Sequence, residues 1–181
     1  MSDYYAQAVS REDLRQLAYV IRKEFGYLDV WKIPVDRLLD QMCEAFEDFS
    51  YEIVPDDEWE DKSTHADTDI LGGTIRIRES IYNRACDGHG RDRMTIAHEI
   101  AHYVLCCVIG VKLYSRRGKH VERYNDPEWQ AKCLAGELLI PYYKFKERNK
   151  TPSVGLIQTL CGVSSDAAEL HFQIITGGDA T

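Results

Sequence analysis

Residues 91–109, RDRMTIAHEIAHYVLCCVI, contain the pattern from which the fold is predicted. Apolar residues recur through this stretch at the spacing of a helix, which predicts a largely buried one. His98, Glu99 and His102 interrupt the apolar pattern. Burying two imidazoles and a carboxylate is costly unless these groups are paired or bind a metal ion. The stretch therefore predicts a core helix that carries a polar centre.

The polar residues of this helix form an H-E-x-x-H pattern. His98 and His102 are four residues apart, so both lie on one helix face and can converge on a single ion. Glu99 lies about 100° around the helix, close to such an ion but not bound to it. The arrangement is typical of a zinc site in which the ion activates a water molecule and the glutamate acts as general base. The alternative is a chance match on a surface helix, which the apolar flanks disfavour.

A catalytic zinc ion needs a third protein ligand and an open coordination position. The extended motif that continues with Gly and a third His is excluded, because Leu105 and Val108 occupy those positions. The ligand must then come from later in the chain, where the candidates are His120, Glu122, Asp126, Glu128 and Glu137.

Helix geometry favours Glu128 among these candidates. On a helix that begins after Asp126, it shares a face with small and apolar residues that allow close packing: Ala131, Ala135 and Leu138. Glu137 falls on the opposite face, where we expect solvent, and Asp126 suits the N-cap. His120 and Glu122 lie in a predicted loop and remain open.

The other patterns predict an α+β fold. Further helices are expected from Ser10 to Gly26, from Pro34 to Phe46 and from Asp126 to Pro141, and the tail after Pro152 reads as two short helices joined at 161–164. Strands are expected at 49–55 and 70–78, with a polar loop at 56–69 and a bulge or turn at Gly72-Gly73. Ile75 and Ile77 would belong to an edge strand that pairs with a substrate backbone.

Composition excludes several classes of protein. A net charge of −8 is unsuited to general phosphate binding, so direct contact with nucleic acid is not expected. The six cysteines lack C-x-x-C spacing and are expected to be reduced packing residues. No leader-like N-terminus and no apolar run of about 18 residues is found, so we expect a cytoplasmic protein without membrane contact.

The runs RDRMTIAHEIAHYVL (91–105) and NDPEWQAKCLAGELLIP (125–141) resemble the ImmA/IrrE family of metallopeptidases, and the similarity covers about residues 70–141. The resemblance implies a zincin-like fold in which a small sheet packs beside several helices. It also implies a Zn²⁺ site with ligands His98, His102 and Glu128, and Glu99 as catalytic residue. The family usually has Asn where this chain has Lys132.

The resemblance also suggests what the chain does. Family members cleave or otherwise inactivate helix-turn-helix repressors, so we expect a zinc endopeptidase whose protein substrate is a DNA-binding repressor or antitoxin-like regulator of a phage, mobile element or stress response. The alternative is a zinc-stabilised binding module that sequesters the regulator without cutting it. Lys132 motivates this alternative, because a charge that competes with zinc would impair catalysis more readily than metal binding.

Two further expectations complete the sequence-based prediction. Residues 1–145 would form the zincin-like domain with its N-terminal helices, and 146–181 a helical segment whose second helix lacks Lys and Arg and therefore contacts protein, not DNA. Candidates for oxyanion or substrate contacts are Tyr103, His120, Arg123 and Tyr124.

Overall fold

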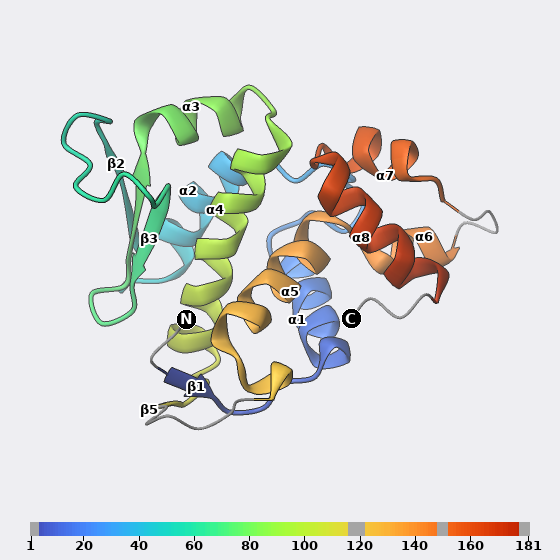
Figure 1. Cartoon of the computed structure of the whole chain (residues 1–181), viewed down its shortest axis with the longest axis horizontal. Coiled ribbons are helices and arrows are strands. Elements are labelled where there is room, and N and C mark those ends of the chain that lie inside the picture. The colour runs from blue at the N-terminus through green and yellow to red at the C-terminus, as the bar shows by residue number, and fades with distance from the viewer. Residues whose placement is uncertain (1–3, 116–121, 148–151, 178–181) are drawn as a thin grey trace.

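A computed structural model describes residues 4–115, 122–147 and 152–177 of the chain (Figure 1). The helices are α1 (Arg11–Glu24), α2 (Val35–Ala45), α3 (Glu79–Cys86), α4 (Gly90–Tyr103), α5 (Pro127–Leu139), α6 (Tyr142–Glu147), α7 (Val154–Cys161) and α8 (Ser165–Thr176). The strands are β1 (Tyr4–Ala6), β2 (Ser50–Val54), β3 (Ala66–Asp69), β4 (Thr74–Arg78) and β5 (Leu113–Ser115). The predicted α+β class is confirmed.

Local sequence signals explain where the helices begin. The Ser10 hydroxyl accepts a hydrogen bond from the Asp13 amide at 3.1 Å, and the Asp13 carboxylate accepts one from the Ser10 amide at 3.3 Å. This reciprocal capping box satisfies two amide groups that a helix start would otherwise leave unpaired. Pro34 precedes α2, and Asp126 caps α5, so the starts of these helices were predicted correctly.

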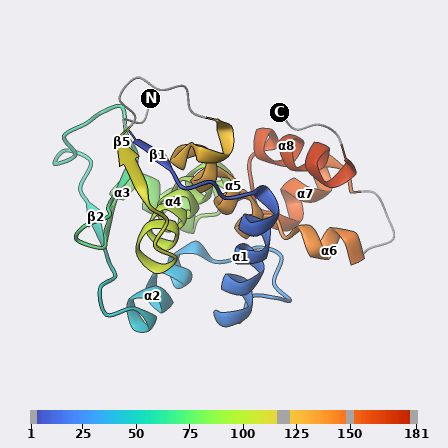
Figure 2. The same ribbon diagram turned by 90° about the horizontal axis from the view of Figure 1, so that it is seen from below.

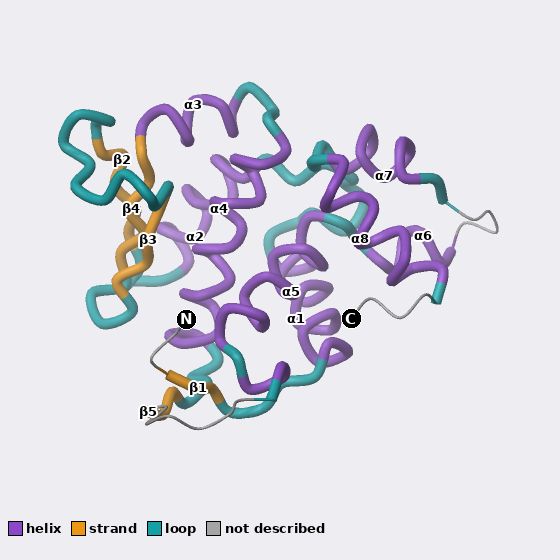
Figure 3. The backbone as a smooth tube through the Cα atoms, viewed as in Figure 1, coloured by secondary structure: helices purple, strands orange, loops and turns teal. Residues whose placement is uncertain are grey.

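The three-stranded sheet has the order β2-β4-β3, with β2 parallel and β3 antiparallel to β4. Ile75 and Ile77 of β4 are fully buried. Figure 3 shows these strands on one side of α4, while α5 and α1 lie on its other side. β1 and β5 form a separate antiparallel pair (Figure 2).

The prediction was wrong in one part of this sheet. Residues 66–69, expected to be loop, form β3, so β4 is the central strand and Ile75 and Ile77 do not lie at an edge. The sequence Ala-Asp-Thr-Asp has no apolar alternation, and its strand conformation depends on pairing with β4.

The short helix α3 was not predicted. The helix expected over 91–109 is α4 followed by a π-helical turn at Val104–Val108.

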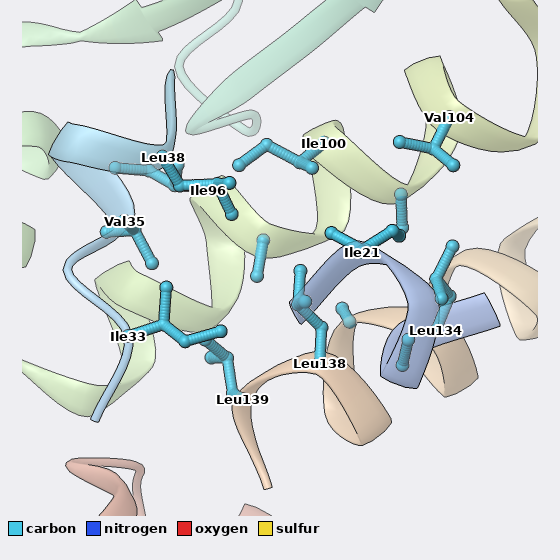
Figure 4. Packing of buried hydrophobic residues seen from close by; sticks show 14 of the residues in the cluster. Ile21, Ile33, Val35, Leu38, Ile96, Ile100, Val104, Leu134, Leu138 and Leu139 are labelled. Atoms are coloured by element: carbon cyan, nitrogen blue, oxygen red, sulfur yellow. The ribbon is translucent and has the colours of Figure 1, made fainter. Parts of the chain in front are cut away.

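The core lies between α4 and the helices that surround it. Figure 4 shows apolar side chains from α1, α2, α4 and α5 that converge there, including Ile21, Leu38, Ile96, Ile100 and Leu138. All of these except Ile21 have no exposed surface. Burying a large aliphatic side chain stabilises the fold by about 1.5–3 kcal/mol, so this packing fixes α4 firmly against α5.

The C-terminal helices α6, α7 and α8 gather beyond α5, away from the three-stranded sheet (Figures 1 and 2). The predicted boundary between residues 145 and 146 falls within α6, and the division into two parts stays a prediction. All six cysteines are free thiols, but only Cys133 and Cys161 are buried, so the expected packing role fits those two alone. Within the described ranges, no helix is both long and apolar enough to cross a membrane.

Candidate metal centre

The helical pattern of α4 places the two histidines one turn apart on the same face. The His98 and His102 rings lie at 86° to each other with centroids 4.6 Å apart. Their Nε2 atoms are separated by 3.1 Å. Both side chains are mostly shielded from solvent, with 19% and 14% of their surfaces exposed. Two imidazole nitrogens thus point at one location on the helix surface.

The first turn of α5 brings Glu128 to this location. Its two carboxylate oxygens lie 3.3 Å from His98 Nε2 and 3.4 Å from His102 Nε2. Asp126 Oδ1 accepts a hydrogen bond from the Glu128 amide at 3.0 Å, which fixes the helix start beside α4. The ligand atoms of the three residues all lie within 4.8 Å of one another.

This donor set fits a zinc ion. A tetrahedral ion with ligands at about 2.0–2.2 Å keeps those ligand atoms about 3.3–3.6 Å apart. The separations of 3.1, 3.3 and 3.4 Å are close to that range. Two imidazoles and one carboxylate also match the ligand types of catalytic zinc sites.

The electrostatics of Glu128 reflect the same convergence. Hydrogen bonds from the His102 and His98 imidazoles hold the pKa of its carboxyl well below the ordinary value, although partial burial opposes this effect. The carboxylate is therefore ionised at neutral pH. No arginine or lysine forms an ion pair with it among the described residues, so the nearest groups are two histidine nitrogens.

Glu99 lies on α4 beside the histidines and is buried, with 8% of its surface exposed. The hydroxyl of Thr68, on the edge strand β3, donates a hydrogen bond to Glu99 Oε2 at 2.7 Å. Sequence analysis did not identify Thr68, because it falls in the segment expected to be loop. The sheet thus contributes a partner for the carboxylate that the H-E-x-x-H pattern singles out.

Glu137 shows a correction to the sequence-based assignment. It does lie away from Glu128, but it is buried, with 2% of its surface exposed, instead of facing solvent. Arg15 Nε and Nη2 donate to its carboxylate oxygens at 3.1 and 3.2 Å, and Arg11 lies 3.6 Å away. The helix pattern predicted its face correctly, but it could not show that α1 covers that face.

The structure separates the candidates for oxyanion or substrate contacts. Tyr103 is 3% exposed, and its ring centroid lies 4.6 Å from that of Phe49 and 6.0 Å from that of Phe46. It is therefore a residue of the hydrophobic core. Tyr124 is 49% exposed and remains accessible to a ligand. Arg123 packs over the Trp129 ring at 5.6 Å. His120 lies outside the described residues.

Glu122 and Lys132 are close to Glu128 in sequence, but neither belongs to the proposed ligand set. Glu122 is exposed at the start of the short turn before α5 and does not join the three-ligand group. Lys132 is exposed and lines a pocket together with His98. No ion pair joins Lys132 to Glu128 within the described ranges.

Comparison with known proteins identifies the family of this chain. No curated protein matches the sequence. The peptidase family described as the IrrE N-terminal-like domain matches residues 55–171, which is more than half of the chain. The match includes all of α4 and α5 and residues 165–171 of α8. The chain therefore belongs to this family of metallopeptidases.

Proposed function

We propose that this protein is a zinc-dependent endopeptidase that cuts a DNA-binding repressor or a related regulator. The observation that carries the proposal is the convergence of His98, His102 and Glu128 from two helices, with the buried carboxylate of Glu99 beside them. The peptidase family supports a protein substrate. The regulator as the class of substrate rests on the resemblance of 91–105 and 125–141 to ImmA/IrrE proteins.

Each residue of the proposed centre has a separate role. When bound, zinc would supply Lewis acidity to the scissile carbonyl and lower the pKa of the attacking water. Glu99 accepts a proton from that water and delivers it to the leaving amine. Thr68 is a positioning residue, because its hydrogen bond fixes one oxygen of Glu99 and leaves the other for the proton.

The edge strand β3 offers a way to hold the substrate. It pairs with β4 on one side, and it is the last strand of the three-stranded sheet as described. Its Thr68 contacts Glu99, so this strand runs next to the proposed centre. An extended peptide can add to such an edge through main-chain hydrogen bonds, which bind many sequences with similar strength.

The proposal is tested by comparing wild-type protein with Glu99→Gln. Both are purified for metal analysis and co-expressed with the candidate repressor encoded near this chain's own gene. We expect about one zinc per chain in both proteins and repressor fragments only with the wild type. The substitution keeps every proposed ligand and removes only the base, so it separates metal binding from chemistry.

The alternative function is a zinc-stabilised module that sequesters the regulator, and the exposed Lys132 beside His98 favours it. Zinc in both proteins without fragments in either, together with full biological effect of Glu99→Gln, would establish that alternative. Absence of zinc from the wild-type protein after purification and reloading would overturn the proposed centre itself.

A further inference from the structure

A pocket of about 360 Å³ lies directly beside the proposed centre. Its walls come from α4, α5 and α8, and His98 forms part of one wall. Most of the lining is apolar, with Met94 from α4, Ala135 from α5 and Ala167 and Leu170 from α8. The volume lies at the lower end of the roughly 300–1,000 Å³ typical of ligand pockets, which suits a single side chain.

The pocket depends on a close approach of α5 and α8. His171 of α8 lies against Gly136 of α5, where an added Cβ would fall 2.4 Å from His171 Nε2. His171 is 4% exposed and lines the pocket, and no hydrogen bond to it is formed within the described part of the chain. This buried imidazole, without a hydrogen-bond partner among the described residues, adds a polar contact to the pocket. The polar residues that also line it are Arg91, Thr95, Lys132 and Ser164, although most of the lining surface is apolar.

The α8 wall is fixed relative to the metal centre. Arg93, on α4 and 2% exposed, donates hydrogen bonds to the carbonyl oxygens of Gly162 at 2.9 Å and Cys161 at 3.3 Å. At the start of α4, a Cβ added to Gly90 would lie 2.3 Å from the Val163 carbonyl carbon. The turn between α7 and α8 therefore docks onto the helix that carries His98 and His102.

We propose that this pocket binds one large apolar side chain of the substrate, next to the peptide bond that is cut, and that α8 thereby sets the specificity. The inference rests on the proposed function. A peptide held at the metal centre passes His98, and that residue also forms a wall of the pocket, so a neighbouring side chain reaches it without a separate binding event. The C-terminal helix pair is then part of substrate recognition and not a DNA-reading element.

The test uses two small metal-binding probes and the full chain loaded with zinc. Acetohydroxamate binds zinc with almost no side chain, whereas 3-phenylpropanohydroxamate adds an aromatic group that can enter the pocket. Calorimetry with the Glu99→Gln protein avoids any dependence on activity. We expect the phenyl compound to bind at least about tenfold more tightly, the gain typical of burying one large apolar group.

Two substitutions on α8 form a matched pair. Ala167→Leu adds an apolar side chain inside the pocket, and Gln173→Leu adds the same side chain at an exposed site on the same helix. We expect Ala167→Leu to reduce the preference for the phenyl compound to less than about threefold and Gln173→Leu to leave it unchanged. If Ala167→Leu does not fold, Leu170→Ala, which removes part of the wall at a partly exposed site, should also weaken the preference.

The outcomes separate this inference from the proposed function. Zinc-loaded protein with equal affinity for both probes, or an Ala167→Leu protein that keeps the full preference, overturns the role of the pocket alone. A protein that holds no zinc and binds neither probe overturns the proposed function and this inference with it.

Discussion

Two glutamates on α5 have opposite environments. Glu128 is in the first turn, has 46% of its side chain exposed and faces the nitrogens of His98 and His102. Glu137 is near the end of the helix, has 1% of its side chain exposed and pairs with Arg15 and Arg11. The carboxylate of Glu137 is paired with two arginines, whereas the carboxylate of Glu128 faces two imidazole nitrogens.

The difference shows how a structural carboxylate and a candidate ligand can be distinguished on one helix. A buried carboxylate costs several kcal/mol unless cations and hydrogen bonds compensate for lost hydration, and the two arginines supply both at Glu137. Glu128 shares its location with two nitrogen donors, and a divalent cation would complete the group. We therefore expect substitutions at the two sites to affect different properties.

Glu128→Gln should have the largest effect, on metal affinity. Removing one of three ligands should weaken zinc binding by at least about 100-fold, because even loss of an outer-shell partner costs 10–100-fold. Metal analysis and competition with a chelator measure this change. The unfolding free energy of the metal-free protein should change by less than about 1 kcal/mol, since Glu128 is half exposed. Unchanged zinc affinity would remove Glu128 from the proposed ligand set.

Glu137→Gln should show the reverse pattern. It leaves Arg15 and Arg11 without their carboxylate, so we expect the unfolding free energy to fall by about 3 kcal/mol. Urea denaturation of metal-free protein measures this loss. Zinc content per folded chain should stay at the wild-type level. A double variant that also carries Arg15→Gln should recover part of the stability, because it no longer leaves that cation unpaired.

His171 extends the comparison to pH, because it also packs against α5. Burial, with smaller contributions from the charges of Arg11 and Arg15, lowers its pKa to about 3. The unfolded state has the higher pKa of about 6.5, so it takes up the proton first as pH falls, and stability is lost between about pH 6.5 and 3. For this residue alone, we expect a loss of about 2 kcal/mol between pH 7 and pH 5.

Urea denaturation of metal-free wild type and His171→Leu at pH 7 and pH 5 isolates this contribution. Chelation removes the effect of pH on metal binding, and other titrating groups contribute to both proteins. The variant should lose about 2 kcal/mol less than the wild type over this interval. Equal losses would show that His171 does not stay neutral in the folded protein.

Thr68→Val should have the smallest effect, and only on catalysis. The substitution removes the hydroxyl that donates to Glu99 Oε2 but keeps the β-branched shape suited to strand β3. We expect kcat to fall about tenfold, equivalent to about 1.4 kcal/mol, with little change in KM or zinc content. Thr68→Ser keeps the hydroxyl and should restore most of the rate. Equal rates for the Val and Ser variants would show that the hydrogen bond does not position Glu99.

The fold was predictable where the local signal was strong. The capping box at Ser10 and Asp13, the N-cap at Asp126 and the apolar periodicity around His98 located three helices and the α+β class. The strand β3 was missed because its conformation comes from pairing with β4 and not from its own composition. The burial of Glu137 was missed because it depends on α1, which is more than a hundred residues away in sequence.

The sequence by itself determined that His98, Glu99 and His102 share one helix in a zincin-like chain, because residues three to four apart on a helix must be neighbours. The tertiary structure decided the remainder. It brought Glu128 within 3.4 Å of the histidines, placed Thr68 against Glu99 and enclosed a pocket beside His98 with α8. These relations join elements distant in the chain, and only the packing of helices and strands specifies such contacts.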